Sequence, residues 1–119
     1  MRNLPTLLKE KEPILKGMGT TATLMKIHKK KAHIAHVGDS RLYLLRNNQL
    51  IQKTKDHTLI QEQIDLGILS EESAKNQKFK NIITRCIGYD KDTNVDTCRL
   101  LLQKNDIILL CSDGLYDML

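Results

Sequence analysis

Two aspartates follow apolar, strand-like segments, and their chemistry suits a divalent cation. Asp39 comes two residues after an apolar run that ends at Val37, and Asp113 comes two residues after the run 107–111. Both runs are predicted as buried strands, and rigid strand ends hold side chains in place better than loops do. Two carboxylates brought together in this way favour Mg²⁺ or Mn²⁺. Taken alone, each aspartate is better interpreted as a turn residue that hydrogen-bonds the backbone.

A zinc site built from histidines is the weaker alternative. His33 and His36 are three residues apart in a predicted strand, so their side chains point to opposite faces. His28 and His57 lie elsewhere in the sequence. We therefore interpret all four as strand and loop residues.

Patterns of β-branched and apolar residues predict the strands. Four of them cover residues 20–28, 32–37, 42–45 and 49–53. The turns between them are short, with Lys29 to Lys31 in the first and Asn47-Asn48 in the last. Such connections predict an antiparallel meander. Two further strands, over 95–102 and 107–111, are predicted to form a hairpin.

Three helices and an incomplete fourth are predicted from capping residues and apolar spacing. The first begins near Asn3, the second is capped by Thr58 and ends at Gly67, and the third is capped by Ser70. A last helix begins after Gly114 and has about one turn before the sequence stops. Since an isolated helix needs roughly 12–15 residues, we expect part of the domain to lie beyond it.

Composition limits the classes of function. The 119 residues suit one small domain, and the net charge of +5 is scattered, with its densest run in a predicted hairpin turn. We therefore expect no nucleic-acid partner. No apolar stretch approaches the roughly 20 residues that span a bilayer, so we expect no membrane partner. The three cysteines form no CxxC pair, which is typical of reduced thiols in a cytoplasmic protein.

Five short motifs come in order along the chain. They are Gly17-Met18-Gly19-Thr20-Thr21, Val37-Gly38-Asp39-Ser40-Arg41, Asp56-His57-Thr58, Ile83-Thr84-Arg85-Cys86-Ile87-Gly88 and Ser112-Asp113-Gly114-Leu115-Tyr116-Asp117. Each motif is weak alone. Together, in this order and with these gaps, they resemble the bacterial metal-dependent protein serine/threonine phosphatases of the PP2C or PPM type.

The resemblance implies an α+β fold, as part of a PP2C-like four-layer α/β/β/α sandwich with two antiparallel sheets. It also implies that residues 1–119 are the central portion of a PPM-type phosphatase domain, truncated at both ends. The family's opening Asp-Gly-Met-Gly-Gly-type turn and its closing Asp-Asn motif, both of which hold metal, have no match in this sequence.

By resemblance, three aspartates are metal ligands. Asp113 matches the family's metal-binding aspartate, while Asp39 and Asp117 match positions linked to a third ion. The family uses two or three Mn²⁺ or Mg²⁺ ions to activate a water that hydrolyses phosphoserine and phosphothreonine, so the implied partners are phosphorylated proteins. Arg85 receives no role in phosphate binding.

Missing ligands lead us to expect little activity from this chain alone, because the metal would bind weakly and the attacking water would not be positioned. The rival hypothesis is a non-catalytic, phosphatase-like remnant that acts as a protein-interaction module. Such a module would also self-associate through exposed sheet edges.

Overall fold

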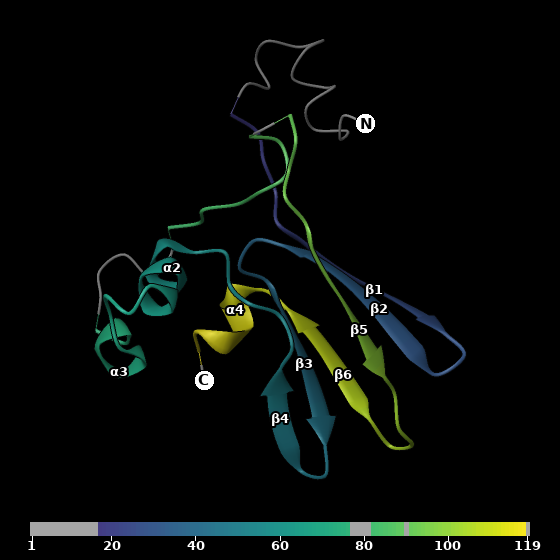
Figure 1. Cartoon of the computed structure of the whole chain (residues 1–119). Helices are drawn as coiled ribbons and strands as arrows, with labels where there is room; N and C mark the ends of the chain where they lie inside the picture. Colours follow the sequence, from purple (N-terminus) through teal and green to yellow (C-terminus); the bar gives the residue numbers. More distant parts are fainter. Residues whose placement is uncertain (1–16, 77–81, 90, 119) are drawn as a thin grey trace.

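The described part of the chain forms two three-stranded antiparallel sheets, and short helices lie beside them (Figure 1). The computed structural model describes residues 17–76, 82–89 and 91–118. One sheet has the strand order β1 (Ala22–His28), β2 (Lys31–Val37), β5 (Asp96–Leu101). The other has the order β4 (Gln49–Gln52), β3 (Arg41–Arg46), β6 (Ile107–Cys111). The predicted α+β fold with two antiparallel sheets is confirmed.

The central strands β2 and β3 supply most of the core. Ala32 and Ile34 of β2, and Leu42 and Leu44 of β3, are at most 3% exposed. They alternate with more exposed residues because successive side chains of a strand point to opposite faces. The same alternation exposes His33 and buries His36, as predicted for two histidines three positions apart.

The predicted four-strand meander is wrong, because β2 and β3 belong to different sheets. β2 pairs with β1 and β5, whereas β3 pairs with β4 and β6. Between β2 and β3, Gly38 adopts a φ of +110°, and the chain passes from one sheet to the other. A short bend at which the chain changes sheet resembles a hairpin turn in sequence, since both use glycine and small polar residues.

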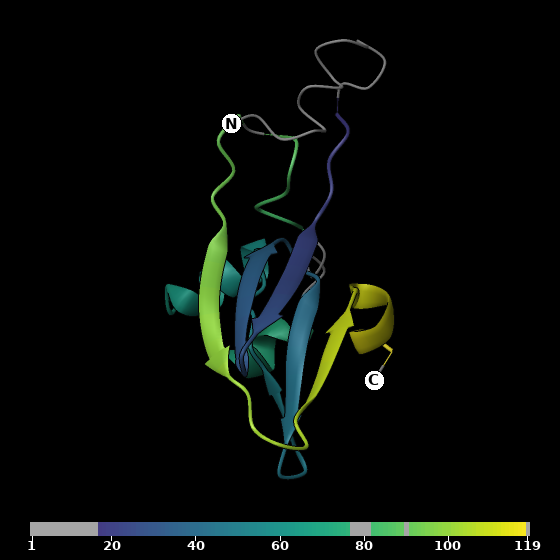
Figure 2. The ribbon, with the colours of Figure 1, turned by 90° about the vertical axis from the view of Figure 1, so that its right-hand side faces the viewer.

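The predicted hairpin of the last two strands is also wrong. β5 pairs with β2 and β6 pairs with β3, so their connection crosses between the sheets. Arg46 holds this connection, since it forms two hydrogen bonds with the Asp106 carboxylate and a third with the Leu101 carbonyl. β6 is an edge strand rather than a buried one, and Figure 2 shows it at the outer side of its sheet.

Two tight hairpin turns agree with the prediction. Lys29 and Lys30 connect β1 to β2 with φ values of 48° and 66°. Asn47 and Asn48 connect β3 to β4 with φ values of 52° and 61°. Two successive residues with positive φ match the right-handed twist of the flanking strands.

Three short helices occur in the described residues: α2 (Leu59–Asp65) and α3 (Glu71–Ala74) lie between β4 and β5, and α4 (Asp113–Tyr116) follows β6. The predicted caps are confirmed, because the side chains of Thr58 and Ser70 each accept a hydrogen bond from a backbone N–H in the first turn. The helix predicted near the N-terminus lies outside the described residues. Within the ranges given above, no helix combines the length and the apolar character needed to cross a membrane.

Candidate metal site

The turn after β2 and the helix after β6 meet at one place. The Tyr116 hydroxyl of α4 donates a 2.6 Å hydrogen bond to the backbone carbonyl of Asp39. Asp39 follows the first sheet and α4 follows the second, so this bond joins segments 77 residues apart in the sequence. The two aspartates at the ends of β2 and β6 are thereby placed on segments that touch.

Asp39 lies in a region of negative charge. Its residue surface is 7% exposed, and burial raises the pKa of its carboxyl. The charge of Asp113 raises this pKa further, and Asp56 and Asp117 contribute in the same direction. In the described ranges, the ion pairs involve other carboxylates: Asp56, Asp65, Asp96 and Asp106. Asp39, Asp113 and Asp117 take part in none of these ion pairs, so a bound cation would relieve the repulsion among their carboxylates.

Helix α4 carries the other two predicted ligands. Asp113 lies in its first turn, and Asp117 closes the turn by donating its backbone N–H to the Asp113 carbonyl over 3.0 Å. The structure therefore places Asp113 and Asp117 one helical turn apart. Asp113 is half-buried and Asp117 is exposed.

These residues fit Mg²⁺ or Mn²⁺ in charge and in donor type, because hard cations prefer carboxylate oxygens. The ligand set is incomplete, however. Among the residues that the structure describes, no three His, Cys, Asp or Glu side chains are grouped so that they could hold a metal ion. The three aspartates can therefore supply only part of a metal site.

Arg41 is a cation close to these carboxylates, but it is bound to another one. Its Nε and Nη2 donate to the two oxygens of Asp56 over 2.9 and 2.6 Å. Its guanidinium carbon also lies 3.5 Å from the ring centroid of Tyr116. Burial lowers the pKa of Arg41, but the hydrogen bonds with Asp56 and Tyr43 outweigh burial and the net shift is upward. The charge of Arg41 is thus neutralised by Asp56.

The motif Asp56-His57-Thr58 fixes the loop before α2. Asp56 binds Arg41, Thr58 caps α2, and His57 Nε2 is 2.7 Å from the Asp96 carboxylate. Sequence reasoning missed Asp96, since this residue belongs to none of the five motifs. Its other partner is Arg85, at 2.8 Å, so the Arg85 guanidinium is engaged with a protein carboxylate.

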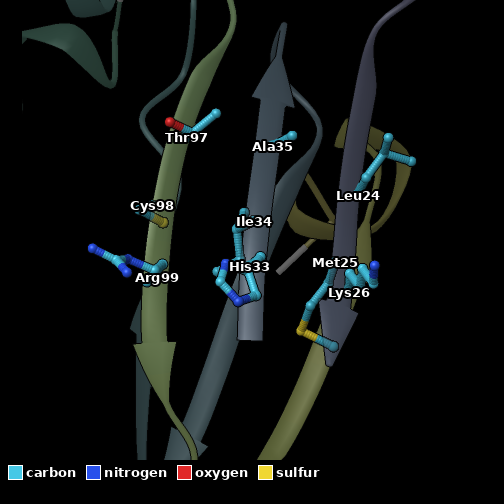
Figure 3. A pocket seen from close by; sticks show the side chains of 9 residues that line it. All are labelled: Leu24, Met25, Lys26, His33, Ile34, Ala35, Thr97, Cys98 and Arg99. Carbon is cyan, nitrogen blue, oxygen red and sulfur yellow. The ribbon is translucent and has the colours of Figure 1, made fainter. Parts of the chain in front are cut away.

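A broad hollow of about 930 Å³ lies elsewhere, on the sheet formed by β1, β2 and β5 (Figure 3). Its lining includes Lys26, His33 and Arg99, which the strand register places side by side across the three strands. None of the described residues that line it carries a carboxylate. This hollow is therefore unsuited to the cation that the aspartates predict.

The two antiparallel sheets and the short helices beside them define the protein as one of the α+β class. The family model described as "Protein phosphatase 2C" matches residues 6–119. The chain therefore belongs to the protein phosphatase 2C family, and the resemblance stated from the five motifs is confirmed.

Curated and solved relatives agree with this assignment. The serine/threonine phosphatase stp of Listeria welshimeri is 46% identical over 112 residues, which are 94% of this chain and 44% of that protein. The crystal structure of the Mycobacterium tuberculosis serine/threonine phosphatase PstP/Ppp matches with a TM-score of 0.92 and 36% identity, over 97% of this chain and 48% of that one.

A structure of the PstP catalytic domain in complex with two manganese ions matches with a TM-score of 0.78 and 36% identity. The match includes 97% of this chain and 47% of that chain. The chain thus spans about half the length of the relatives named here.

Proposed function

We propose that this chain supplies one part of the metal site of a protein serine/threonine phosphatase, with residues 1–119 forming part of the domain. The proposed ligands are Asp39, Asp113 and Asp117, and the proposed ion is Mn²⁺ or Mg²⁺. The observation that carries the proposal is the contact of α4 with the Asp39 turn, which concentrates negative charge that no cationic side chain of the described residues neutralises. Relatives named as serine/threonine phosphatases support it.

The residues of this chain prepare that place for a cation. Tyr116 holds the backbone of Asp39 beside α4. Asp56 neutralises the Arg41 guanidinium, so Arg41 does not compete with a metal ion for the carboxylates of Asp39, Asp113 and Asp117. A bound divalent ion would lower the pKa of a water that attacks the phosphorus of phosphoserine or phosphothreonine. Phosphorylated proteins are the proposed substrates. A cytoplasmic location is also proposed, and the free thiols of Cys98 and Cys111 support it.

The test separates metal binding from turnover. Mn²⁺ is titrated into ¹⁵N-labelled protein, and paramagnetic broadening is followed at Asp39 and Asp113, with Asp113→Ala as the comparison. We expect selective broadening that requires Asp113, and little Mn²⁺-dependent hydrolysis of a phosphothreonine peptide, because the ligand set is incomplete. Broadening that is uniform, or unchanged in Asp113→Ala, would contradict the proposed ligands.

A non-catalytic interaction module is the second candidate. It is favoured by the incomplete ligand set and by the edge strand β6, where Ile107 is 58% and Leu110 47% exposed. An apolar strand with an unpaired edge is a template for pairing with another strand. Sedimentation over a range of concentrations would show association that Ile107→Lys reduces. A monomer at all concentrations would exclude self-association.

A further inference from the structure

His57 holds both backbone polar groups of Gly38, the residue that precedes Asp39. The Gly38 N–H donates to His57 Nδ1 over 2.9 Å, and the His57 N–H donates to the Gly38 carbonyl over 2.9 Å. His57 is 4% exposed, so water does not compete strongly for either bond. One side chain and one peptide group therefore fix the turn that carries Asp39.

The hydrogen bonds of His57 define its tautomer. Because Nδ1 accepts from Gly38, it carries no proton, and the proton of the neutral ring lies on Nε2. Nε2–H then donates to the Asp96 carboxylate over 2.7 Å. With both nitrogens occupied, His57 has no lone pair available for proton transfer.

Asp96 orients the ring from its far side. Its second oxygen accepts from Arg85 over 2.8 Å. Burial raises the pKa of Asp96, but the hydrogen bonds from His57 and Arg85 together outweigh burial and hold this pKa below its ordinary value. An ionised Asp96 favours the Nε2–H tautomer, and that tautomer is the one that leaves Nδ1 able to accept from Gly38.

The turn needs such a support because its backbone is unusual. Gly38 adopts a φ of +110°, and a Cβ at this position would lie 2.3 Å from Thr21 Cγ2. The next residue, Asp39, is held by Tyr116 through its carbonyl. The peptide units around Asp39 are thus anchored on one side by His57 and on the other by Tyr116.

We propose that His57, oriented by Asp96 and Arg85, is a positioning residue that fixes the Gly38–Asp39 turn and thereby the carboxylate of Asp39. The structural part of this proposal stands on the hydrogen bonds alone, whereas its consequence for a cation rests on the proposed function. This chain of contacts joins the loop before α2, strand β5 and the turn after β2, which lie far apart in the sequence.

Two substitutions separate the nitrogens of His57. In His57→Asn the side-chain oxygen can reach the position of Nδ1, so the acceptor for Gly38 is kept and the donor to Asp96 is lost. In His57→Gln the amide nitrogen can reach the position of Nε2, so the donor is kept and the acceptor is lost. Both variants remove the ring, which makes each a control for the other.

The first measurement uses the unaltered protein. A scalar coupling across the hydrogen bond between Gly38 ¹⁵N and His57 ¹⁵Nδ1, together with the ¹⁵N shifts of the ring, would establish the bond and the tautomer. Absence of the coupling in the folded chain, or a proton on Nδ1, would overturn the proposal. This result needs no variant to fold and no metal to bind.

The variants then test positioning. We expect Gly38 amide exchange to become about tenfold faster in His57→Gln and to change much less in His57→Asn. The Asp39 carboxyl ¹³C shift should move only in His57→Gln, and the affinity for Mn²⁺ should fall about tenfold in that variant alone. Equal effects in both variants would overturn the proposal.

The two hypotheses fail in different ways. If the unaltered chain binds no Mn²⁺, the proposed metal site fails, and the exchange and carboxyl measurements still decide the role of His57. If Mn²⁺ binds and His57→Gln retains both the affinity and the Asp39 shift of the unaltered chain, the role of His57 fails while the metal site stands.

Discussion

Tyr116 contacts Asp39 through the backbone carbonyl of that residue, over 2.6 Å, and the same aromatic ring lies 3.5 Å from the Arg41 guanidinium. One side chain of a single-turn helix thus contacts both ends of the Asp39-Ser40-Arg41 segment. The contact couples the position of α4 to the turn after β2.

Tyr116→Phe removes the hydroxyl and keeps the ring beneath Arg41. We expect a loss of about 1 kcal/mol in the free energy of unfolding, since the Asp39 carbonyl loses a donor in a half-buried place. Tyr116→Leu should lose more, because it removes the cation–π contact as well. Chemical denaturation of the three proteins measures both steps. Equal stability of Tyr116→Phe and the unaltered chain would show that the hydroxyl contributes nothing.

Arg41→Lys should destabilise the protein although it keeps the charge. Lysine cannot form the paired hydrogen bonds with Asp56, nor can it lie flat on the Tyr116 ring. We expect a loss of about 2 kcal/mol. The comparison is Lys55→Ala, which removes the pair with Asp65; that pair is exposed to solvent, so its loss should change the stability little. Thermal or urea denaturation should rank the two variants clearly, and a reversed order would contradict the role given to Arg41.

Gly38→Ala should be more damaging than an alanine at another glycine with positive φ. The added Cβ would lie 2.3 Å from Thr21 Cγ2, whereas a Cβ added at Gly67, with a φ of +76°, would meet no described residue within 4 Å apart from its chain neighbours. Gly67→Ala therefore measures backbone strain alone, about 1 kcal/mol. Gly38→Ala adds a steric clash, so we expect at least twice that loss by denaturation. Similar losses would mean that the turn adjusts around Thr21.

Acid should weaken the connection between β5 and β6. The hydrogen bond from Arg46 lowers the pKa of Asp106 to about 2, from an ordinary value of 3.8, and the backbone N–H of Gln103 assists. Because the folded pKa is below the unfolded one, the stability that the carboxylate contributes is complete above 3.8 and is lost as the pH falls towards 2.

Urea denaturation of the unaltered chain and of Asp106→Asn between about pH 5 and pH 2 tests this. The difference in stability between them should be greatest at the upper end and should shrink as Asp106 takes up its proton. A difference that stays constant over this range would contradict the assigned role. Asp65→Asn, which alters an exposed pair, should show a smaller dependence on pH.

Local structure was largely predictable from the sequence, because local rules decide it. Thr58 and Ser70 precede helices with side chains that satisfy a backbone N–H, and Asn47-Asn48 tolerate the positive φ of a tight turn. Each of these features depends on a few neighbouring residues. The same is true of the alternation that buries His36 and exposes His33.

Pairing between the strands was not predictable in the same way. The segment Gly38-Asp39-Ser40 joins two sheets, yet its composition is that of a hairpin turn, so the meander was a natural and incorrect expectation. The role of Asp96 was hidden for a related reason, since its partners His57 and Arg85 become neighbours only after β5 pairs with β2. Asp39 and Asp113 stood out in the sequence because each follows an apolar, strand-like run, which is a local pattern.

The strand order of the two sheets has a consequence for folding during synthesis. Each sheet begins as a local hairpin, β1 with β2 and β3 with β4, and each receives its third strand from much later in the chain. As the polypeptide leaves the ribosome, both hairpins emerge before their third strands. One edge of β2 stays unpaired until β5 is synthesised, and one edge of β3 stays unpaired until β6 is synthesised. Pairings between distant segments form slowly, so nascent chains would pass through a stage with exposed strand edges, at which aggregation is favoured and chaperone binding would help most.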